Sequence, residues 1–289
     1  MLMLDFAWYL KQARDNKTRS KLKEYERIAR ELVDPRHWMG FRERQRFPLR
    51  LGSFKFWLND NNVFGSLDAY LELFKERHHT KLRSFLGTED KVIVDLGASE
   101  GYYTLKMKEN SPRAKVIAVE PNPEAFRILR RNIRENNLKN VVLSRTVISE
   151  RIGKVDFEIA EGMTQIGAIR IFGDREWLEK RGIRIRKFAA KSTTLERLLK
   201  SHGIRKVGLL KIDTEGSEVK ILRSSRGILK DIGKIVVEYH GEKVRKQVKD
   251  FLKENGFRLL FEESADSGIV EEVCRSPCKE AYFENRSFA

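Results

Sequence analysis

The spacing of hydrophobic residues changes near residue 91. From there on, short runs of Val, Ile and Leu alternate with stretches whose apolar residues recur at helical spacing. This alternation is typical of a mostly parallel sheet that helices cover on both faces. The strands that it predicts are KVIVDLG, KVIAVEP, NVVLSRTVIS, VGLLKID, KIVVEYH and FRLLFEE, followed by a final antiparallel strand at AYFEN. Helices are predicted at 101–109, 123–137, 218–229 and 242–255, the last with Gly256 at its C-terminal end.

Residues 1–86 follow a different pattern and are predicted to form an N-terminal extension to a domain at 87–289. Polar residues and an apolar stripe at helical spacing predict a helix over 11–30, and a second amphipathic helix is predicted over 67–86. Alternating Phe and Leu residues predict short strands around Gly52. The extension is therefore expected to be mainly helical, with short strands.

One segment, 153–191, interrupts the strand–helix alternation of the second domain. It is predicted to contain two strands, KVDFEIA and IRIRKFAAK, on either side of a loop with a turn over 173–182. The segment reads as an inserted strand–loop–strand unit.

The charge is strongly positive: 58 Lys and Arg face 42 Asp and Glu, a formal net charge of +16. Residues 11–55 hold 14 basic and 6 acidic residues, and residues 170–191 hold 8 and 3. A protein this basic is attracted to polyanions. The extension and the 170–191 loop therefore predict binding of RNA or DNA, and RNA is taken as the expected partner.

Composition also limits the compartment. The two cysteines, Cys274 and Cys278, lie close together without a second pair, which disfavours a zinc site. Free thiols are expected, with a local disulfide as the alternative. The first ten residues contain Asp5 and lack a basic start, so no signal peptide is predicted. No apolar run reaches the length of a membrane span. A cytoplasmic protein is expected, and the abundance of Lys, Arg and Glu resembles that of heat-adapted proteins. The oligomeric state is not predicted.

The first candidate site follows the first strand of the sheet, at Asp95-Leu-Gly97-Ala98-Ser-Glu-Gly101. Glycines let the backbone approach a ligand, and the following helix offers free N–H groups. The spacing differs from the G-x-G-x-x-G of dinucleotide-binding folds, and Asp95 would repel a pyrophosphate but suits a ligand with an amino group. A tight turn without a ligand is the alternative.

A second acid, Glu120, ends the next predicted strand. A carboxylate at this place accepts both hydroxyls of a bound ribose. NAD would satisfy Glu120 equally well, but together with the glycine spacing it favours S-adenosylmethionine (SAM).

The third candidate site is Lys211-Ile-Asp213-Thr-Glu215-Gly-Ser-Glu218, at the end of the fourth strand. Ligands of open α/β sheets bind at the carboxyl ends of the strands, so these acids should border the same crevice as Asp95 and Glu120. Glu218 has a structural alternative, because an acid at the first turn of a helix also stabilises the helix dipole.

These motifs resemble the FkbM-type methyltransferases. DLGASEGYYT, AVEPNPEAFRILRRNI, TTLERLL with GLLKIDTEGSEVKIL, and IVVEYHG occur in the same order as that family's motifs, over about residues 92–261. The resemblance implies a class I SAM-methyltransferase fold, which is a Rossmann-like α/β domain with a seven-stranded, mostly parallel sheet. It also implies that SAM is held by Asp95, Gly97, Gly101 and Glu120, with Ala98 and Asn122 in the same loops. Asp213, Glu215 and His240 would face the methyl acceptor.

Histidines supply the candidate proton acceptors. His240 follows the fifth strand beside Glu238, and a histidine near neutrality can take a proton from a hydroxyl or an amine. Alternatively it stacks or caps the sheet. His78 and His79, at the end of a predicted helix, are expected on the surface. Asp213, Glu238 and His240 have donor atoms that suit Mg²⁺, but the strand ends between Asp213 and Glu215, so no metal site is assigned.

The sequence thus predicts a SAM-dependent methyltransferase that acts on RNA, ribosomal or transfer, at a base amine or a ribose hydroxyl. The alternative is an O-methyltransferase for a sugar or another small molecule, as in the family that the chain resembles. A non-catalytic nucleic-acid-binding protein is disfavoured by the intact glycine motif and acids.

Overall fold

The computed structural model describes most of the chain, and every structural statement below refers to these residues. They are 6–31, 48–59, 62–74, 77, 79–87, 91–164, 167–169, 175–180, 182–264 and 279–288. Cys274, Cys278 and His78 lie outside them, as do Arg170 and the first residues of the predicted 173–182 turn.

The central sheet has seven strands, as predicted. Their order across the sheet is β12 (Phe257–Ser264), β13 (Lys279–Asn285), β11 (Ile232–Tyr239), β10 (Val207–Ile212), β3 (Val92–Leu96), β4 (Lys115–Val119) and β5 (Val141–Ser144). Neighbours from β11 to β5 pair in parallel, and β13 pairs antiparallel with both β11 and β12. The class I SAM-methyltransferase fold is confirmed, and the chain order reverses direction at β3 and β10, where a ligand crevice is expected.

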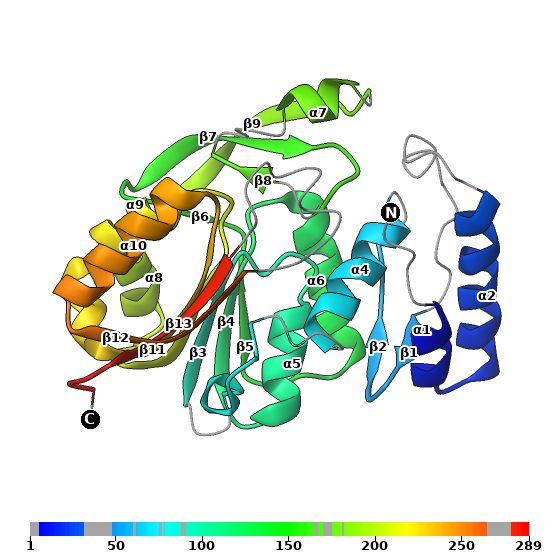
Figure 1. Cartoon of the computed structure of the whole chain (residues 1–289), viewed down its shortest axis with the longest axis horizontal. Coiled ribbons are helices and arrows are strands. Elements are labelled where there is room, and N and C mark those ends of the chain that lie inside the picture. The colour runs from blue at the N-terminus through cyan, green and yellow to red at the C-terminus, as the bar shows by residue number, and fades with distance from the viewer. Residues whose placement is uncertain are drawn as a thin grey trace.

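Helices cover both faces of this sheet (Figure 1). One face carries α5 (Tyr102–Asn110) and α6 (Pro123–Glu135); the other carries α8 (Leu195–Ser201), α9 (Glu218–Ser224) and α10 (Glu242–Glu254). Alternation along each strand produces the two layers: Ile93 packs on the α5 side and Val94 on the other. The helix predicted over 218–229 is α9 followed by a 3₁₀ turn, η2 (Arg226–Asp231).

The N-terminal extension contains α1 (Phe6–Gln12), α2 (Asn16–Glu31), β1 (Leu49–Leu51), β2 (Phe54–Phe56), α4 (Val63–Phe74) and the 3₁₀ turn η1 (Arg83–Phe85). The hairpin around Gly52 is confirmed. The helix predicted over 11–30 is confirmed from residue 16 on, as α2. Its first residues differ: the chain breaks at Ala13, which bridges to Leu51, and Asp15 caps α2 by accepting the N–H of Thr18 at 2.8 Å.

The second helix prediction, over 67–86, is wrong. Helix α4 begins four residues earlier, at Val63, and ends at Phe74. Beyond it, Arg77 and His79 have φ values of +64° and +57°, a left-handed conformation that an α-helix cannot contain. The segment instead turns toward the sheet.

The extension packs directly on the α5 face of the sheet. Its buried Tyr9, Leu22 and Phe56 belong to the same hydrophobic cluster as Leu105 of α5 and Tyr282 of β13. The hydrophobic core thus continues from the methyltransferase sheet into the described residues of the extension.

Two asparagines of α6 hold the extension in register. Asn132 accepts the N–H of Trp57 at 2.6 Å and donates to its carbonyl at 3.2 Å, and Asn136 pairs with the N–H and carbonyl of Lys55 at 2.8 and 2.7 Å. Residues four apart lie on one face of a helix, and residues two apart lie on one side of a strand. The two side chains therefore act as a short ladder that joins β2 to α6, and the guanidinium of Arg131 stacks over the Trp57 ring at 3.7 Å.

The insertion forms a second, four-stranded sheet. Its order is β6 (Val147–Ile148), β9 (Ile185–Thr193), β7 (Gly153–Ala160) and β8 (Gly167–Ala168). The two predicted strands are confirmed as β7 and β9. The loop between them contains a helix, α7 (Arg175–Lys180), that the sequence pattern did not predict, and the predicted third strand of the main sheet is divided into β5 and β6. Figure 1 shows this sheet above the main one.

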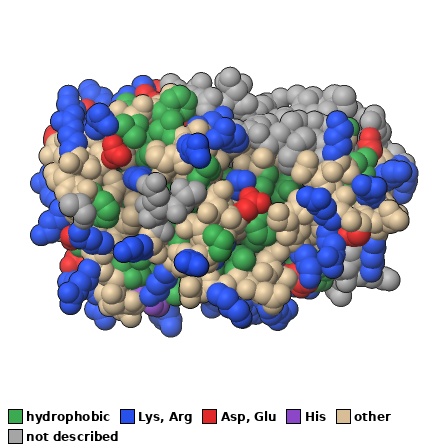
Figure 2. Space-filling model, turned by 90° about the horizontal axis from the view of Figure 1, so that it is seen from below, with side chains coloured by type: hydrophobic (Ala, Val, Ile, Leu, Met, Phe, Trp, Pro, Cys, Tyr) green, Lys and Arg blue, Asp and Glu red, His purple; other side chains and the backbone are tan. Residues whose placement is uncertain are grey.

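Basic side chains cover much of the surface. Figure 2 shows Lys and Arg spread over the described part of the face in view, with fewer Asp and Glu between them. In the inserted sheet, however, several are paired: Arg175 with Glu158 at 2.8 Å and Lys187 with Asp156 at 2.7 Å. Part of the local charge at 170–191 is therefore neutralised within the fold. Among the described residues, no helix is long and apolar enough to span a membrane.

Candidate active site

The loop after β3 is tightly fixed to the neighbouring strand. The N–H groups of Gly97 and Ala98 both donate to the carbonyl of Val119 at 3.0 Å, and that of Gly101 donates to Ala98 at 2.8 Å. Gly101, with φ +94°, is the N-cap of α5. The predicted strand–turn–helix context of the glycine motif is confirmed.

Gly97 is required by the protein itself. A β-carbon at this position would lie 1.7 Å from the carbonyl oxygen of Asp213. The sequence pattern explained this glycine by the approach of a ligand. The structure adds a reason within the protein: the loop after β3 packs so closely against the loop after β10 that no side chain fits at Gly97.

Asp95 is fully buried at the end of β3. Its Oδ2 accepts the hydroxyl of Thr104 at 2.6 Å, and its Oδ1 lies 3.5 Å from the ammonium of Lys211. That Oδ1 has no hydrogen-bond partner among the described residues. Lys211 also donates to the carbonyl of Gly97 at 2.9 Å and pairs with Asp213 at 3.0 Å, so one lysine connects the two strand ends.

Glu120, at the end of β4, is held by two backbone donors. Its carboxylate accepts the N–H of Ser99 at 2.8 Å and that of Asn122 at 2.7 Å. Burial raises the pKa of Glu120 to about 7, and the two N–H donors oppose this rise. Asn122 is buried and caps α6 by accepting the N–H of Glu124 at 3.0 Å, so its amide oxygen already has a structural role.

Glu100 joins three parts of the chain beneath this loop. Its fully buried carboxylate accepts the hydroxyls of Ser66 from the extension at 2.8 Å, Thr164 from the insertion at 2.5 Å and Tyr102 at 2.6 Å. Burial raises the pKa of Glu100, and these three donors oppose the rise. The sequence pattern gave Glu100 no role, because Ser66 and Thr164 are far away from it along the chain.

The acids after β10 meet His240, as predicted. His240 Nδ1 lies 2.9 Å from Glu218 Oε1, while His240 Nε2 lies 3.4 Å from Glu215 and 3.9 Å from Asp213. Glu218 Oε1 also accepts the N–H of Gly216 at 3.0 Å. Glu218 therefore both stabilises the turn before α9 and orients His240.

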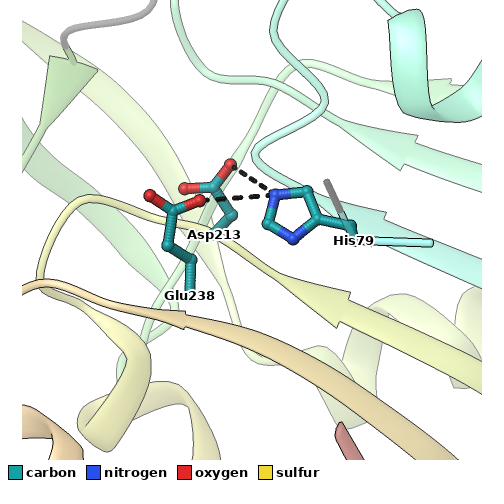
Figure 3. A group of neighbouring side chains, drawn as sticks. All are labelled: His79, Asp213 and Glu238. Carbon is teal, nitrogen blue, oxygen red and sulfur yellow. Dashed lines mark ion pairs between the residues drawn. The ribbon is translucent and has the colours of Figure 1, made fainter. Parts of the chain in front are cut away.

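His79 is not on the surface, which corrects the prediction. Its side chain is 8% exposed, and its Nε2 lies 3.3 Å from Glu238 and 3.8 Å from Asp213 (Figure 3). Its Nδ1 lies 3.3 Å from the buried carboxylate of Glu280 on β13. No local signal in the sequence identifies His79, because its partners come from β10, β11 and β13.

Both imidazoles are held as cations by the surrounding acids. Burial alone would lower the pKa of His79, but its bonds to Glu238 and Glu280 outweigh burial and raise it to about 10. For His240, burial is likewise outweighed by Glu215, Glu218 and Glu238, and the pKa rises well above its ordinary value. The surrounding acids thus favour the protonated form of His240, which cannot accept a further proton as a general base would.

Two groups have donor atoms that a metal ion can use: His79 with Asp213 and Glu238, and Asp213 with Glu215 and His240. In both groups the ligand atoms lie within 4.8 Å of one another. Each carboxylate of the first group already faces a cationic side chain, because Lys211 and His79 approach Asp213 and His79 approaches Glu238. The contacts of the first group are therefore explained by ion pairs between these side chains, without a metal ion.

A comparison with protein families decides the identity of the chain. The model of the methyltransferase FkbM domain matches residues 95–259, which is more than half of the sequence. The chain belongs to the FkbM methyltransferase family. The matched range begins at Asp95 and includes Glu120, Asp213 and His240, but it excludes His79 and Glu280.

The individual proteins that resemble this chain share less than a third of its residues over most of the FkbM domain. The chain is 27% identical over 194 residues to methyltransferase sdnD of Sordaria araneosa, covering 58% of this chain and 73% of that protein. It is 23% identical over 176 residues to the 2-O-methyltransferase NoeI of Sinorhizobium fredii, covering 57% and 70%. Among solved structures, M. jannaschii TYW2 in complex with AdoMet covers 84% of this chain and 85% of its own, at 18% identity and a TM-score of 0.40.

This FkbM methyltransferase uses SAM, and the residues at the ends of β3 and β4 fit it. The buried Oδ1 of Asp95 lies 3.5 Å from the Lys211 ammonium but has no hydrogen-bond partner within the described structure, so it can still accept a hydrogen bond from the amino group of a ligand. Glu120 projects beside it from the next strand, with its carboxylate fixed by two N–H groups. That each of the predicted residues contacts SAM stays a prediction; the structure shows that they lie at the ends of the neighbouring strands β3 and β4.

Proposed function

We propose that this methyltransferase acts on RNA and that the acceptor is a ribose hydroxyl. SAM supplies a methyl group bound to a positively charged sulfur, which an oxygen nucleophile attacks. The protein must therefore hold the acceptor hydroxyl in line and accept its proton. The carboxylates of Asp213 and Glu238 are the groups placed to accept it, with His240 beside both.

One observation carries the RNA part of the proposal. Helix α6 begins directly after Glu120, and Arg127, Arg130 and Arg134 are all exposed along it. Their spacing of three and four residues places them on one face of the helix. Arginine recognises phosphate through a planar fork of donors. This arginine row therefore extends from the cofactor edge as a track for a phosphate backbone.

The overall charge agrees with this placement. The exposed residues of α2 include Lys17, Arg19, Lys23 and Arg27, so a second basic helix lies on the extension. The acceptor cluster itself is rich in acids. A polyanion would therefore be attracted to the surface around the site rather than to its centre, where a single uncharged hydroxyl is the group that fits.

A small-molecule hydroxyl is the second candidate, and a specific observation favours it. The relative NoeI is named as a 2-O-methyltransferase, which supports an oxygen acceptor without requiring RNA. An amine of an RNA base is a less favoured acceptor than a ribose hydroxyl, because the name of NoeI specifies methylation of an oxygen.

The deciding experiment is methyl transfer from radiolabelled SAM to total RNA and, in parallel, to a small-molecule extract of the same cells. Label in RNA, recovered after digestion in a 2′-O-methylated nucleoside, is the expected result. Label in a nucleoside whose ribose is not methylated, and which is therefore methylated on its base, would contradict the proposal of a ribose hydroxyl as the acceptor. Label confined to the extract would overturn the RNA proposal and favour the second candidate.

A matched pair of variants tests the arginine row. Replacing Arg127, Arg130 and Arg134 with Gln should raise the KM for RNA at least tenfold, and should reduce the slope of log affinity against log salt by about 2 if three phosphates are lost. The control replaces three exposed lysines of α10, Lys243, Lys246 and Lys253, with Gln, the same change in charge. Equal effects of both triple variants would show that only net charge matters.

A further inference from the structure

His79 reaches the acceptor site from outside the FkbM domain, and β13 fixes its position. The N–H of His79 donates to Glu280 Oε2 at 2.5 Å, and the N–H of Lys81 donates to the hydroxyl of Tyr282 at 3.1 Å. The Phe85 ring packs edge-on against Tyr282 at 5.0 Å. The segment from 79 to 85 is thus attached to one strand at three points, with His79 at φ +57° directing its side chain into the site.

The imidazole bridges two sets of acids. Its Nδ1 faces Glu280, which is fully buried and also accepts the hydroxyl of Tyr282 at 2.8 Å. Its Nε2 faces Asp213 Oδ2 and Glu238 Oε2, at 3.8 and 3.3 Å, and Figure 3 shows the ring directed at this carboxylate pair. A ring held by a buried acid at one nitrogen has a fixed orientation at the other.

Each of the two carboxylates divides its oxygens between the histidines. Asp213 presents Oδ2 to His79 and Lys211, and Oδ1 to His240 at 3.9 Å. Glu238 presents Oε2 to His79 and Oε1 to His240, also at 3.9 Å. His79 therefore occupies one side of the pair and leaves one oxygen of each acid on the side of His240.

We propose that His79 is a positioning residue of the acceptor site: it holds one oxygen of Asp213 and one of Glu238, so that their other oxygens face His240 and the acceptor. This inference rests on the acceptor site of the proposed function but not on RNA as the substrate. Two neighbouring carboxylates repel each other, and a cation between them lowers the cost of keeping them close. The FkbM domain alone would lack this cation, so the extension completes the site.

The other groups around the ring do not replace it. Lys211 approaches Asp213 Oδ2 at 3.0 Å, but its ammonium also lies 3.5 Å from Asp95 and donates to the carbonyl of Gly97 at 2.9 Å, both on the cofactor side. The ring of Tyr103 lies edge-on to His79 at 6.0 Å and contributes no charge. Glu238 is held on this side by His79.

The test compares His79→Gln and Glu280→Gln with the wild-type full-length chain. Both variants should lower kcat at least tenfold, measured on whichever fraction, RNA or extract, the wild-type chain labels, while the affinity for SAM stays within about threefold. Glu280→Gln leaves the imidazole in place but weakens its anchor, so it serves if His79→Gln fails to fold. His202→Gln, the same change at the C-terminal end of α8, is the matched control and should leave kcat unchanged.

A second readout needs no acceptor at all. In an NMR titration, the His79 ring should titrate well above an ordinary histidine in the wild-type chain, and about one pH unit or more lower in Glu238→Gln, which removes one of the two acids that raise its pKa. A His79 that titrates at the ordinary value overturns the proposal. So does a His79→Gln variant that is folded, binds SAM and turns over at the wild-type rate. Absence of label in RNA, by contrast, bears only on the choice of substrate.

Discussion

The carbonyl oxygen of Asp213 occupies the space beside Gly97 in which a β-carbon would lie, 1.7 Å away. The loop that ends β3 and the loop that ends β10 thus meet through backbone alone. Because the first loop belongs to the predicted cofactor side and the second to the acceptor side, this contact sets the distance between the two halves of the site.

Replacing Gly97 with Ala should separate these loops. The new methyl group cannot enter without moving the backbone of Asp213, and φ +78° is itself unfavourable for alanine. We expect a loss of about 3 kcal/mol or more of stability, or loss of methyl transfer in a chain that remains folded.

Gly203→Ala is the control for this prediction. Gly203 has a similar φ of +67° but nothing within 4 Å of an added β-carbon, so it should lose only about 1–2 kcal/mol. Urea denaturation measures both, and equal losses would show that the Asp213 contact does not matter.

Asp95→Asn tests the cofactor site with almost no change in volume. The variant removes the charge of a fully buried carboxylate whose Oδ1 has no hydrogen-bond partner in the described structure and lies 3.5 Å from the Lys211 ammonium. We expect SAM affinity to fall by about 1.5–3 kcal/mol, at least tenfold, by calorimetry. Asp250→Asn, on the exposed side of α10, should bind normally, and wild-type affinity in Asp95→Asn would remove Asp95 from the cofactor site.

Glu120 predicts a pH dependence of SAM binding. Burial raises its pKa to about 7, so the carboxylate gains a proton as the pH falls below 7 and loses its ability to accept from both ribose hydroxyls. SAM affinity should therefore decrease from pH 7 to pH 5.5. The Glu120→Gln variant should bind more weakly throughout and show no such decrease; a flat profile for the wild-type chain would contradict the assignment.

Asp213→Asn should separate binding from transfer. Its side chain faces His79, Lys211 and His240 rather than the loop after β4, so SAM should still bind while kcat falls at least a hundredfold, the lower range for removal of a general base. The control is Asp156→Asn, an exposed acid paired with Lys187. Undiminished turnover in Asp213→Asn would exclude Asp213 from proton transfer.

Asn132→Ala should loosen the extension. Its amide makes three hydrogen bonds, to the N–H and carbonyl of Trp57 and to the carbonyl of Glu100, and all become unsatisfied on truncation. We expect a loss of about 2–4 kcal/mol by urea denaturation. Asn110→Ala, which removes one bond within its own helix to Lys106, should cost less than about 1 kcal/mol. Similar losses would argue against the ladder between α6 and β2.

The sequence predicted the sheet well because its signals are local. Buried parallel strands are continuous runs of Val, Ile and Leu, and the strand–turn–helix around Gly97 and Gly101 is defined within ten residues. The same locality placed Asp95, Glu120, Asp213 and His240 at one edge, because the carboxyl ends of parallel strands meet there.

Predictions failed where distant contacts override local pattern. The amphipathic stretch 67–86 has helical spacing, yet Glu280 and Tyr282 bind its last part through backbone N–H groups and draw it out of a helix. His79 consequently moved from an expected surface position into the acceptor site.

By itself, then, the sequence determined the fold, the cofactor and the edge of the sheet where chemistry takes place, since each depends on residues close together in the chain. Only the tertiary structure decided which cationic side chains lie next to the carboxylates of the acceptor site. His79, Asp213, Glu238 and Glu280 come from four separate segments, and the His79 ring lies within 3.8 Å of all three acids only in the folded chain. A linear pattern carries no record of such a contact, because the free energy that creates it arises only when the segments pack.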